Sequence, residues 1–329
     1  MKLRWGIMST ANIAISQVMP GIRQSETGEL AAIASRDRAK AKEAADTFGI
    51  EKAYGSYEEL LADDGIDAVY IPLPNHLHLE WTLKAAVAGK HVLCEKPLAL
   101  TAMEAEKMVE ACRSAGVHLA EAFMYRHHPH MSRIREIVAS GEIGQLRAIR
   151  GAFSYNNDKD AANIRYRSDW GGGAIYDVGC YPLSAGRWIT GKEPVASTVV
   201  GQFSQGHGDV DMMASGLVEF PDGVALTFDC GMWTANRQFM EIVGSTGSID
   251  VLHPFRNDEG LSTLVVTVQG ERREEISGKL NRYALQADDF ARAVTGEKAP
   301  IVANDDAISN MRLLEASLQS AKTGKRIEL

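Results

Sequence analysis

Cysteine is scarce in this chain, with four residues among 329. They are widely separated, form no C-x-x-C pair and have no neighbours typical of a zinc site; they are Cys94, Cys112, Cys180 and Cys230. A disulfide framework and a zinc site are therefore not expected, and the cysteines are predicted to be free thiols with no bound metal. Free thiols fit a reducing cytoplasm.

Long apolar runs are also lacking. The opening MKLRWGIMST has only a few apolar residues before Ser9, too few for the core of a secretory signal. No stretch approaches the roughly 18 apolar residues that are needed to cross a bilayer. We therefore expect a cytoplasmic protein with no membrane partner.

Positive charge is the minority sign, because 43 Asp and Glu residues outnumber 35 Lys and Arg residues and give a net charge of −8. A chain of this sign is a poor general partner for nucleic acid. A composition of 45% hydrophobic and 24% charged residues is typical of a globular protein and excludes a disordered chain or a fibre. At roughly 150 residues per domain, the length indicates about two domains.

The first 125 residues alternate short apolar runs with amphipathic stretches. Runs that fit strands buried on both faces are residues 3–8, 30–35, 68–71, 91–94 and 117–120. The stretches between them carry helix signals, such as the capping pair of Thr101 and Glu104. Repetition of strand, helix and strand predicts a doubly wound parallel sheet, because parallel neighbours need a crossover that is usually a helix. We assign residues 1–125 to this α/β domain.

Residues 126–329 show a different pattern. Alternating segments follow one another between residues 146 and 268, separated by turn signals such as Pro221-Asp222-Gly223. Helical spacing appears near 130–140 and again at 283–295 and 304–322. The pattern predicts an α+β domain with a large, mainly antiparallel open sheet.

The first strand leads into a helix through a turn of small residues. The turn that we expect to meet a dinucleotide consists of Ser9, Thr10, Ala11, Asn12 and Ile13. At this place a G-x-G-x-x-G sequence would let the backbone approach a pyrophosphate at the helix N-terminus, and small residues allow the same approach. The alternative is an ordinary tight turn of an α/β protein.

Basic residues follow the second strand, where an NAD-selective site usually presents an acid to the ribose diol. Here the chain carries Ser35, Arg36 and Arg38. A guanidinium suits a 2′-phosphate, so we predict NADP as the cofactor, with NAD as a possible alternative. The other interpretation is a solvated first helical turn that is capped by Asp37.

Polar residues also follow the third and fourth strands, at the carboxyl edge where open α/β sheets hold ligands. The candidates for contact with the cofactor are Pro72, Asn75, His78, Glu95 and Lys96. Pro97 disfavours helix at Lys96, so the ammonium group should project from the end of the strand. A surface lysine and polar residues at a helix start are the alternatives.

Three glycines precede a helical stretch in the second half of the chain, at residues 171–173. They would let the backbone approach a ligand closely. Asp177 and Tyr181 are four residues apart and should share one helix face, where an acid and a phenol suit a proton relay. The alternative is a packing turn followed by a core helix with a buried tyrosine.

Several stretches together resemble the Gfo/Idh/MocA oxidoreductase family. They are WGIMSTANIA at 5–14, PLPNHLH at 72–78, CEKPLAL at 94–100, EAFMYRHHP at 121–129 and GGGAIYDVGCYPL at 171–183. The resemblance covers nearly the whole chain and implies a Rossmann domain followed by a domain for substrate binding and oligomerisation. It places the family's lysine at Lys96 and its aspartate at Asp177.

Two departures from the family pattern are informative. Most members have histidine four residues after the aspartate, whereas Tyr181 is similar to the branch of dimeric dihydrodiol dehydrogenase and NADP-dependent D-xylose dehydrogenase. The phosphate turn has lost both leading glycines. The resemblance further implies that Arg165 and Trp170 border the substrate, and that the chain forms a dimer or tetramer through its C-terminal sheet.

These features predict an NADP-dependent oxidoreductase that moves a hydride between nicotinamide C4 and a sugar or polyol carbon, with an aldose as the first choice. A phenol has a pKa of about 10, so Tyr181 needs a neighbouring positive charge to act as general acid/base near neutral pH. We expect Lys96 to supply that charge and Asp177 to anchor the substrate, although the roles of Lys96 and Tyr181 could be exchanged.

Other activities fit the same residues. They are a sugar ketoreductase that acts on 3-keto or anhydro sugars, an enzyme that retains its cofactor and shuttles hydride between two sugars, a trans-dihydrodiol dehydrogenase, and a non-catalytic dinucleotide sensor.

Overall fold

The computed structural model describes residues 2–160, 163–256, 262–301, 303 and 305–329. Contacts divide the chain into unit 1, which comprises residues 1–127 and 281–308, and unit 2, which comprises residues 128–280 and 309–329. The sequence pattern placed all of residues 126–329 in one domain. Residues 281–308 instead pack with unit 1. Buried side chains of helix α8 join the core of that unit.

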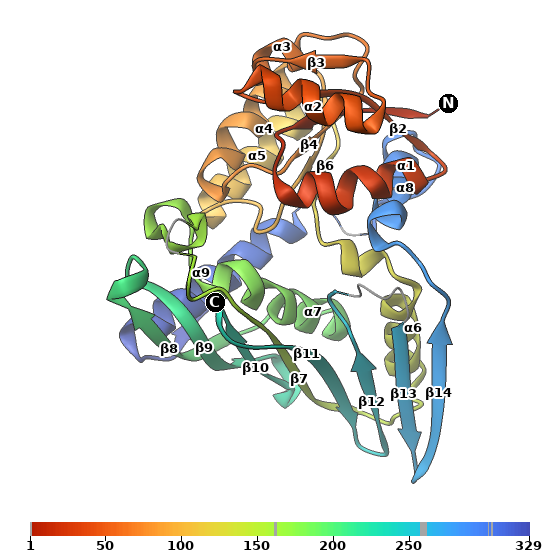
Figure 1. Cartoon of the computed structure of the whole chain (residues 1–329). Coiled ribbons are helices and arrows are strands. Elements are labelled where there is room, and N and C mark those ends of the chain that lie inside the picture. Colours follow the sequence, from red (N-terminus) through yellow and green to blue (C-terminus); the bar gives the residue numbers. More distant parts are fainter. Residues whose placement is uncertain (1, 161–162, 257–261, 302, 304) are drawn as a thin grey trace. The chain divides into compact units, whose positions relative to one another are not determined.

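Unit 1 contains a parallel sheet of six strands among the described residues, in the order β3-β2-β1-β4-β5-β6 (Figure 1). The strands are β1 (Leu3–Met8), β2 (Gly28–Ala34), β3 (Lys52–Tyr54), β4 (Ala68–Ile71), β5 (His91–Cys94) and β6 (Leu119–Glu121). The order reverses between β1 and β4, and open α/β sheets hold ligands at the carboxyl edge of such a switch point. The predicted doubly wound sheet is confirmed.

The helices of unit 1 connect these strands. They are the wide turn η1 (Ala14–Val18), α1 (Met19–Gln24), α2 (Arg38–Phe48), α3 (Tyr57–Leu61), η2 (Asn75–Leu77), α4 (His78–Val87), α5 (Ala102–Ser114), η3 (Met124–His127) and α8 (Arg282–Val294). Side-chain caps fix several starts: Ser56 Oγ accepts from Glu59 N at 3.1 Å, and Thr101 Oγ1 accepts from Glu104 N at 3.1 Å. Each cap satisfies an amide that has no partner within its helix.

Helix α8 belongs to the core of unit 1. Its Phe290 ring lies 5.0 Å from the ring of Trp5 in β1. Gly21 of α1 packs so closely on Tyr283 that a Cβ at Gly21 would lie 2.5 Å from the Tyr283 Cβ. Buried apolar area therefore holds residues 281–308 in unit 1, although they lie far from it in the sequence.

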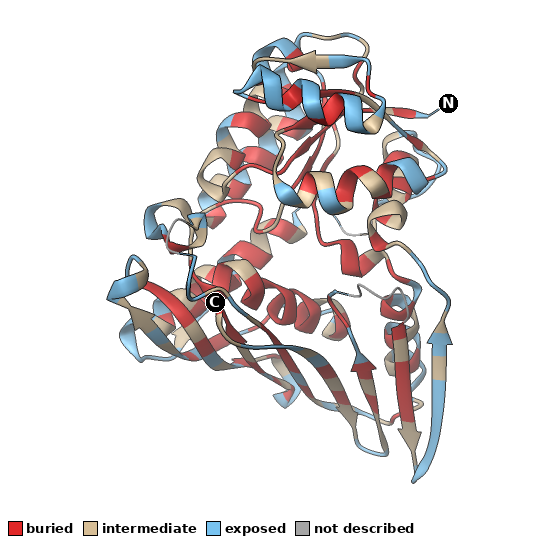
Figure 2. Cartoon of the chain, viewed as in Figure 1, coloured by how far each residue is buried: buried red, intermediate tan, exposed pale blue. Residues whose placement is uncertain are grey.

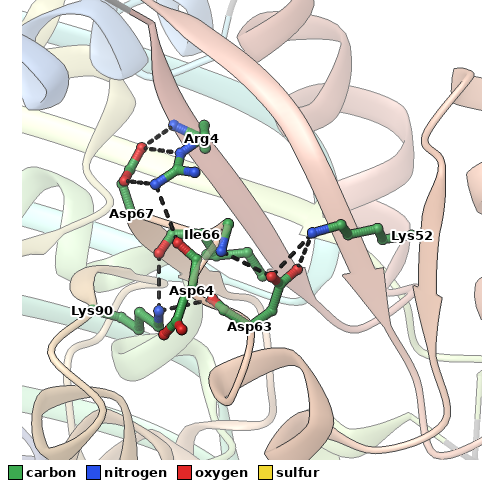
Figure 3. Close-up of polar contacts among 8 residues, drawn as sticks. Arg4, Lys52, Asp63, Asp64, Ile66, Asp67 and Lys90 are labelled. Carbon is green, nitrogen blue, oxygen red and sulfur yellow. Dashed lines mark hydrogen bonds and ion pairs between the residues drawn. The ribbon is translucent and has the colours of Figure 1, made fainter.

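Ion pairs close the amino edge of this sheet, where strands β1, β4 and β5 begin (Figure 3). Arg4 pairs with Asp67 at 2.6 Å, and Lys52 pairs with Asp63 at 2.8 Å. Lys90 is 6% exposed, and its Nζ donates to the carbonyls of Asp63 and Ile66 at 2.9 and 3.0 Å. These contacts fix the loop that leads into β4.

Unit 2 contains a nine-stranded sheet in the order β14-β13-β12-β11-β7-β10-β9-β8-β15. The strands are β7 (Leu146–Asn156), β8 (Ala196–Ser204), β9 (Val210–Glu219), β10 (Ala225–Gly231), β11 (Trp233–Gly244), β12 (Gly247–Leu252), β13 (Ser262–Val268), β14 (Glu271–Ser277) and β15 (Ile327–Glu328). The β7–β10 pair is parallel and the others are antiparallel. The predicted large, mainly antiparallel sheet is confirmed.

Helices cover one face of this sheet. They are α6 (Pro129–Ser140), α7 (Cys180–Thr190), which follows the wide turn η6 (Ile175–Gly179), and most of α9 (Asp306–Thr323); shorter turns are η4 (Ile164–Tyr166), η5 (Ser168–Trp170), η7 (Gln205–His207) and η8 (Pro221–Gly223). Gly151 of β7 meets Pro182 of α7, where a Cβ would lie 3.0 Å from the Pro182 Cβ. Strand β13 is largely buried, whereas β14, at the edge of the sheet, is largely exposed (Figure 2).

In the part of the chain that the structure describes, no helix has the length and apolar character to cross a membrane. Nor do the described residues include a group of three or more His, Cys, Asp or Glu side chains placed to hold a metal ion.

Candidate active site

In the turn after β1, a residue other than glycine has a backbone conformation that is typical of glycine. Ser9 adopts a φ of 148°, which L-residues rarely adopt, and its Oγ accepts from Ala11 N at 3.0 Å. Ser9, Thr10, Ala11 and Ile13 are half-buried, and Asn12 is exposed. Strain of order 1–3 kcal/mol persists only where the surroundings impose it, and it clusters at functional sites. The turn is shaped and accessible as a pyrophosphate cradle requires.

The end of β2 lies beside this turn through a residue that sequence reasoning missed. The side chains of Ser9 and Arg36 act on the Tyr57 hydroxyl and oppose the rise in its pKa that burial causes. Burial raises the pKa of Tyr57, so the hydroxyl stays protonated, and the ring packs edge-on to Trp81 at 4.9 Å. Tyr57 thus ties the predicted phosphate turn to the predicted 2′-phosphate cation. The Ser56 cap in the sequence marked the helix start but gave no sign of this contact.

The other residues at the end of β2 divide by exposure. Ser35 is 8% exposed, and its Oγ accepts from Asp37 N at 3.2 Å. The side chains of Arg36 and Arg38 are exposed, and Asp37 caps α2 through Ala39 N at 3.0 Å. The cap and the basic pair coexist, because the carboxylate points to the helix amides and the guanidinium groups extend from the surface.

Residues at the ends of β4 and β5 form a braced turn. Pro72 is buried and Asn75 is half-buried at the start of η2. His78 is fully buried; its Nε2 lies 2.8 Å from the Leu73 carbonyl and its Nδ1 lies 3.1 Å from the Pro97 carbonyl. The His78 ring therefore supports the turn that carries Lys96, and it does not face a ligand as the sequence led us to expect.

Lys96 and Glu95 follow β5 directly. The Tyr70 hydroxyl donates to Glu95 Oε1 at 2.6 Å, and burial raises the pKa of Tyr70, so the phenol remains the donor. Glu95 N donates to the Ile71 carbonyl at 3.1 Å, which joins the ends of β4 and β5. Lys96 is half-buried and precedes a cis peptide bond to Pro97. The lysine thus lies at the carboxyl edge that the sequence predicted.

In unit 2, a carboxylate, a guanidinium and two phenols come together. Asp177 Oδ2 accepts from the Tyr155 hydroxyl at 2.6 Å and pairs with Arg165 Nε at 2.8 Å. Asp177 raises the pKa of Arg165, and Tyr155 and Tyr181 act on the same guanidinium with the same sign. The structure therefore brings together Arg165, Asp177 and Tyr181, three of the residues predicted to border the substrate. It adds Tyr155, which the alternation of β7 places on the helix-covered face with Gly151.

Tyr181 lies at the start of α7, and Asp177 lies in the wide turn η6 before it. The Tyr181 side chain is 6% exposed. Its ring packs edge-on to Phe153 at 5.1 Å and against Phe255 at 5.5 Å. Aromatic packing fixes the ring, while its charged neighbour is the guanidinium of Arg165.

Two of the three glycines make close contacts within the protein. A Cβ at Gly172 would lie 2.3 Å from the Arg165 carbonyl oxygen, and a Cβ at Gly173 would lie 2.0 Å from Asp211 Oδ1. Gly173 also has a φ of 109°. Gly172 and Gly173 therefore allow the chain to approach itself.

Trp170 lies at the end of η5, before these glycines. The Arg167 guanidinium stacks over its ring at 4.6 Å and pairs with Asp169 at 3.1 Å. Trp170 is half-buried. A stacked cation of this kind fixes an aromatic ring with part of its surface open.

A cavity in unit 1 contains none of the residues that the sequence predicted for the site. It is lined by residues of β6 and α8 and by Pro300, Ile301, Ala303, Asp306 and Ala307. Two pairs of polar groups meet there: Arg126 with Asp306 at 2.6 Å, and His127 with Asp289 at 2.9 Å. We therefore place the candidate active site at the groups described above and not at this cavity.

Comparison with known proteins identifies the family of this chain. The oxidoreductase family model with an NAD-binding Rossmann fold matches residues 3–123, and the GFO/IDH/MocA C-terminal domain model matches residues 131–250. D-xylose 1-dehydrogenase (NADP(+)) 2 of Haloferax volcanii is 40% identical over 329 residues, covering 99% of this chain and 100% of that protein.

Two solved structures are similar over almost the whole chain. The aldose-aldose oxidoreductase of Caulobacter crescentus, complexed with glycerol, has a TM-score of 0.93 at 27% identity and full coverage of both chains. The 3-ketoreductase KijD10 of Actinomadura kijaniata, in complex with NADP and TDP-benzene, has a TM-score of 0.90 at 31% identity, covering 97% of this chain and 98% of that chain. The chain has an NAD(P)-binding Rossmann domain and belongs to the Gfo/Idh/MocA family of oxidoreductases, with relatives that act on sugars.

Proposed function

We propose that this protein is an NADP-dependent dehydrogenase of a neutral aldose or a related polyol. In the reaction, one substrate hydroxyl becomes a carbonyl, NADP⁺ becomes NADPH, and one proton is released. Unit 1 holds the cofactor, and unit 2 supplies the group that exchanges the hydroxyl proton.

The cluster of Tyr155, Arg165, Asp177 and Tyr181 carries this proposal. Asp177 and Arg165 lie 2.8 Å apart, so their charges largely cancel within the cluster. Phenols, a carboxylate and a guanidinium offer donors and acceptors to the hydroxyls of a sugar without a net charge that would demand an ionic ligand. The identity of 40% with a D-xylose dehydrogenase supports the same substrate class.

The carboxyl edge of the parallel sheet fits NADP. The strained turn at Ser9 provides close backbone approach for a pyrophosphate, and Arg36 with Arg38 provides exposed cations for a 2′-phosphate. Tyr57 links the two places, because Ser9 of the turn and Arg36 both act on its hydroxyl. When it is bound, the nicotinamide accepts the hydride that the reaction requires.

Residues of the chain then perform the proton chemistry and the positioning. Tyr181 exchanges the proton of the substrate hydroxyl, and the cation of Arg165 stabilises its phenolate together with the predicted partner Lys96. Asp177 accepts hydrogen bonds that orient Arg165, Tyr155 and the sugar. Glu95, Pro72 and Asn75 shape the edge that carries Lys96, and Trp170 borders the sugar.

Two related activities have support from the comparisons. Reduction of a sugar ketone would use the same residues in the reverse direction, as the similarity to a 3-ketoreductase suggests. Hydride exchange between two sugars would fit the similarity to an aldose-aldose oxidoreductase. Neither alters the assignment of the proton-exchanging group.

A screen at 340 nm tests the proposed function. NADP and NAD are offered with aldoses, inositols and dihydrodiols, and NADPH with keto sugars. Release of many NADPH per enzyme with a neutral aldose supports the proposal. Stoichiometric NADPH without release indicates hydride exchange, and tight NADPH binding with no turnover on any substrate indicates a sensor; either result overturns it.

We further propose that the chain forms a homo-oligomer through the sheet face opposite the helices. The register between neighbouring strands shows that five exposed apolar side chains lie on that face: Val200, Leu217, Phe239, Leu252 and Ile276. Their joint exposure marks an interaction surface. Light scattering on size-exclusion chromatography should show a dimer or tetramer that Phe239→Glu dissociates; a wild-type monomer would refute this proposal.

We also propose a cytoplasmic location. All four cysteines are free and buried, as a chain of a reducing compartment allows. Cell fractionation tests this, and recovery in an exported fraction would contradict it.

A further inference from the structure

We propose that Asp211 is a positioning residue that holds Asp177 and Arg165 in the arrangement described above. This inference rests on the proposed function, because it concerns the same proton-exchanging cluster. Asp211 lies in β9, far in sequence from both residues that it positions. Neither composition nor motif in the sequence points to it.

The carboxylate of Asp211 caps the turn that begins η6. Its Oδ2 accepts from Ile175 N at 2.7 Å. The side chain is 2% exposed, so it lies inside the protein. A buried carboxylate that accepts from a backbone amide restricts that amide strongly.

Gly173 provides the space for this contact. Its φ of 109° is one that residues with a side chain rarely adopt. A Cβ at this position would lie only 2.0 Å from Asp211 Oδ1, so the site has room for glycine alone. The carboxylate therefore packs directly on the peptide backbone of residues 173–175.

The same short turn is bonded to both members of the ion pair. Gly173 N donates to the Arg165 carbonyl at 3.0 Å, and Asp177 N donates to the Gly173 carbonyl at 3.0 Å. Asp177 and Arg165 then meet through their side chains at 2.8 Å. Movement of the Gly173 peptide would displace both ends of this pair, and with them the hydrogen bond from Tyr155 to Asp177.

The pKa of Asp211 reflects its contact with this turn. Burial raises the pKa of Asp211 to about 7, while the amides of Ile175 and Ala174 and the charge of Lys322 in α9 oppose that rise. Cys230 of β10 is the neighbouring thiol, and the Asp211 charge adds to burial in raising the pKa of that thiol. Among the groups that oppose this rise, the amide of Ile175 in the turn has the largest effect.

The test compares Asp211→Ala and Asp211→Asn with a matched control. Asparagine keeps an oxygen that can accept from Ile175 N, and alanine keeps none. Ser197→Ala serves as the control, because it removes a buried hydrogen bond of 3.0 Å between Ser197 and Ser317 in the same unit but away from the turn. The measurements are kcat, KM for sugar, Kd for NADPH, and hydrogen exchange of peptides that cover residues 171–183.

We expect kcat to be about threefold lower than wild type in Asp211→Asn, and at least about tenfold lower in Asp211→Ala than in Asp211→Asn. The Kd for NADPH should be unchanged in both variants. Amide hydrogen exchange at residues 171–183 should be faster in Asp211→Asn than in wild type, and faster again in Asp211→Ala. Ser197→Ala should keep wild-type kcat and exchange in this segment. If Asp211→Ala does not fold, Asp211→Asn alone decides, and an unchanged kcat with unchanged exchange overturns the proposal.

The outcomes also separate this inference from the proposed function. A wild-type protein with no turnover on any sugar contradicts the proposed function, and hydrogen exchange still tests whether Asp211 holds the turn. An active wild-type protein whose Asp211→Ala variant loses no more kcat than Ser197→Ala contradicts the role of Asp211 alone.

Discussion

The two edges of the parallel sheet in unit 1 use charged residues in opposite ways. At the amino edge, Arg4, Lys52 and Lys90 are all bonded to acids or carbonyls of the loop before β4 (Figure 3). At the carboxyl edge, Arg36 and Arg38 extend exposed guanidinium groups. The same residue types therefore stabilise a loop at one edge and face solvent, where a ligand can reach them, at the other.

The difference shows why charge alone does not mark a functional site. Lys90 and Lys96 lie just before and just after strand β5. Lys90 is 6% exposed and donates to two carbonyls, whereas Lys96 is half-buried after the carboxyl end of β5. Position along a parallel strand decides the role, because ligands bind at carboxyl ends.

The largest effect should come from the phenol of Tyr181 in unit 2, to which the proposed function assigns the proton exchange. Tyr181→Phe should lower kcat by about 10²- to 10⁴-fold, the usual range for loss of a general acid/base. The ring keeps its contacts with Phe153 and Phe255, so thermal stability and NADPH binding should be unchanged. Steady-state kinetics and fluorescence titration measure both; wild-type turnover with a rate-limiting chemical step would refute the assignment.

A matched pair of lysine variants tests the two edges directly. Lys96→Met should lower kcat by about 10²- to 10³-fold with little change in the urea midpoint, because the proposed function makes Lys96 the electrostatic partner of the general acid/base. Lys90→Met should keep kcat but cost about 1–3 kcal/mol of unfolding free energy, because two carbonyls lose their donor. If Lys96→Met and Lys90→Met change kcat and unfolding free energy in the same way, the proposed difference between the two edges is contradicted.

Cofactor preference should respond more modestly. Arg36→Ala should reduce the ratio of kcat/KM for NADP over NAD by about tenfold, since a charged hydrogen bond to a 2′-phosphate contributes roughly 1.5–3 kcal/mol. Tyr57→Phe should shift the ratio in the same direction by less, because it removes the hydroxyl on which Arg36 acts. Kinetics with both cofactors measures the ratio, and an unchanged ratio in Arg36→Ala would rule out this cation as the selector.

The smallest effect concerns acid stability at the amino edge. The hydrogen bond from Lys52 lowers the pKa of Asp63 to about 2, below its unfolded value of about 3.9. The resulting stabilisation is complete above about pH 4 and is lost as the pH falls through about 2. Urea unfolding should therefore show Asp63→Asn less stable than wild type at pH 7, with a smaller gap at pH 3 and unchanged kcat. A gap that does not shrink on acidification would contradict this.

Much of the fold could be predicted from local pattern. The strands at 3–8, 68–71 and 91–94 have the predicted bounds, because apolar runs of this length between capped helices have few other solutions. Strand β14 escaped prediction, because its sequence ERREEIS carries charges on both faces and it is held by pairing with β13. Its place at the sheet edge explains how so polar a segment is accommodated.

The candidate site was predictable only in part. Lys96, Asp177 and Arg165 are candidates from the sequence because motifs surround them. Tyr155 and Asp211 were not found, because each acts across the fold on a residue at least 22 positions away. His78 was assigned to the wrong kind of contact, since sequence shows that a histidine follows a strand but not that its ring is enclosed by three carbonyls.

The sequence by itself determined the alternation of elements, the family, and the two places along the chain where chemistry gathers. These depend on the spacing of neighbouring residues, which local sterics and burial translate directly into strands, helices and turns. Only the tertiary structure decided that α8 packs with unit 1, that Gly172 and Gly173 make room for Arg165 and Asp211, and that Arg165 meets Asp177. Such contacts depend on where distant segments pack, and no local pattern encodes that.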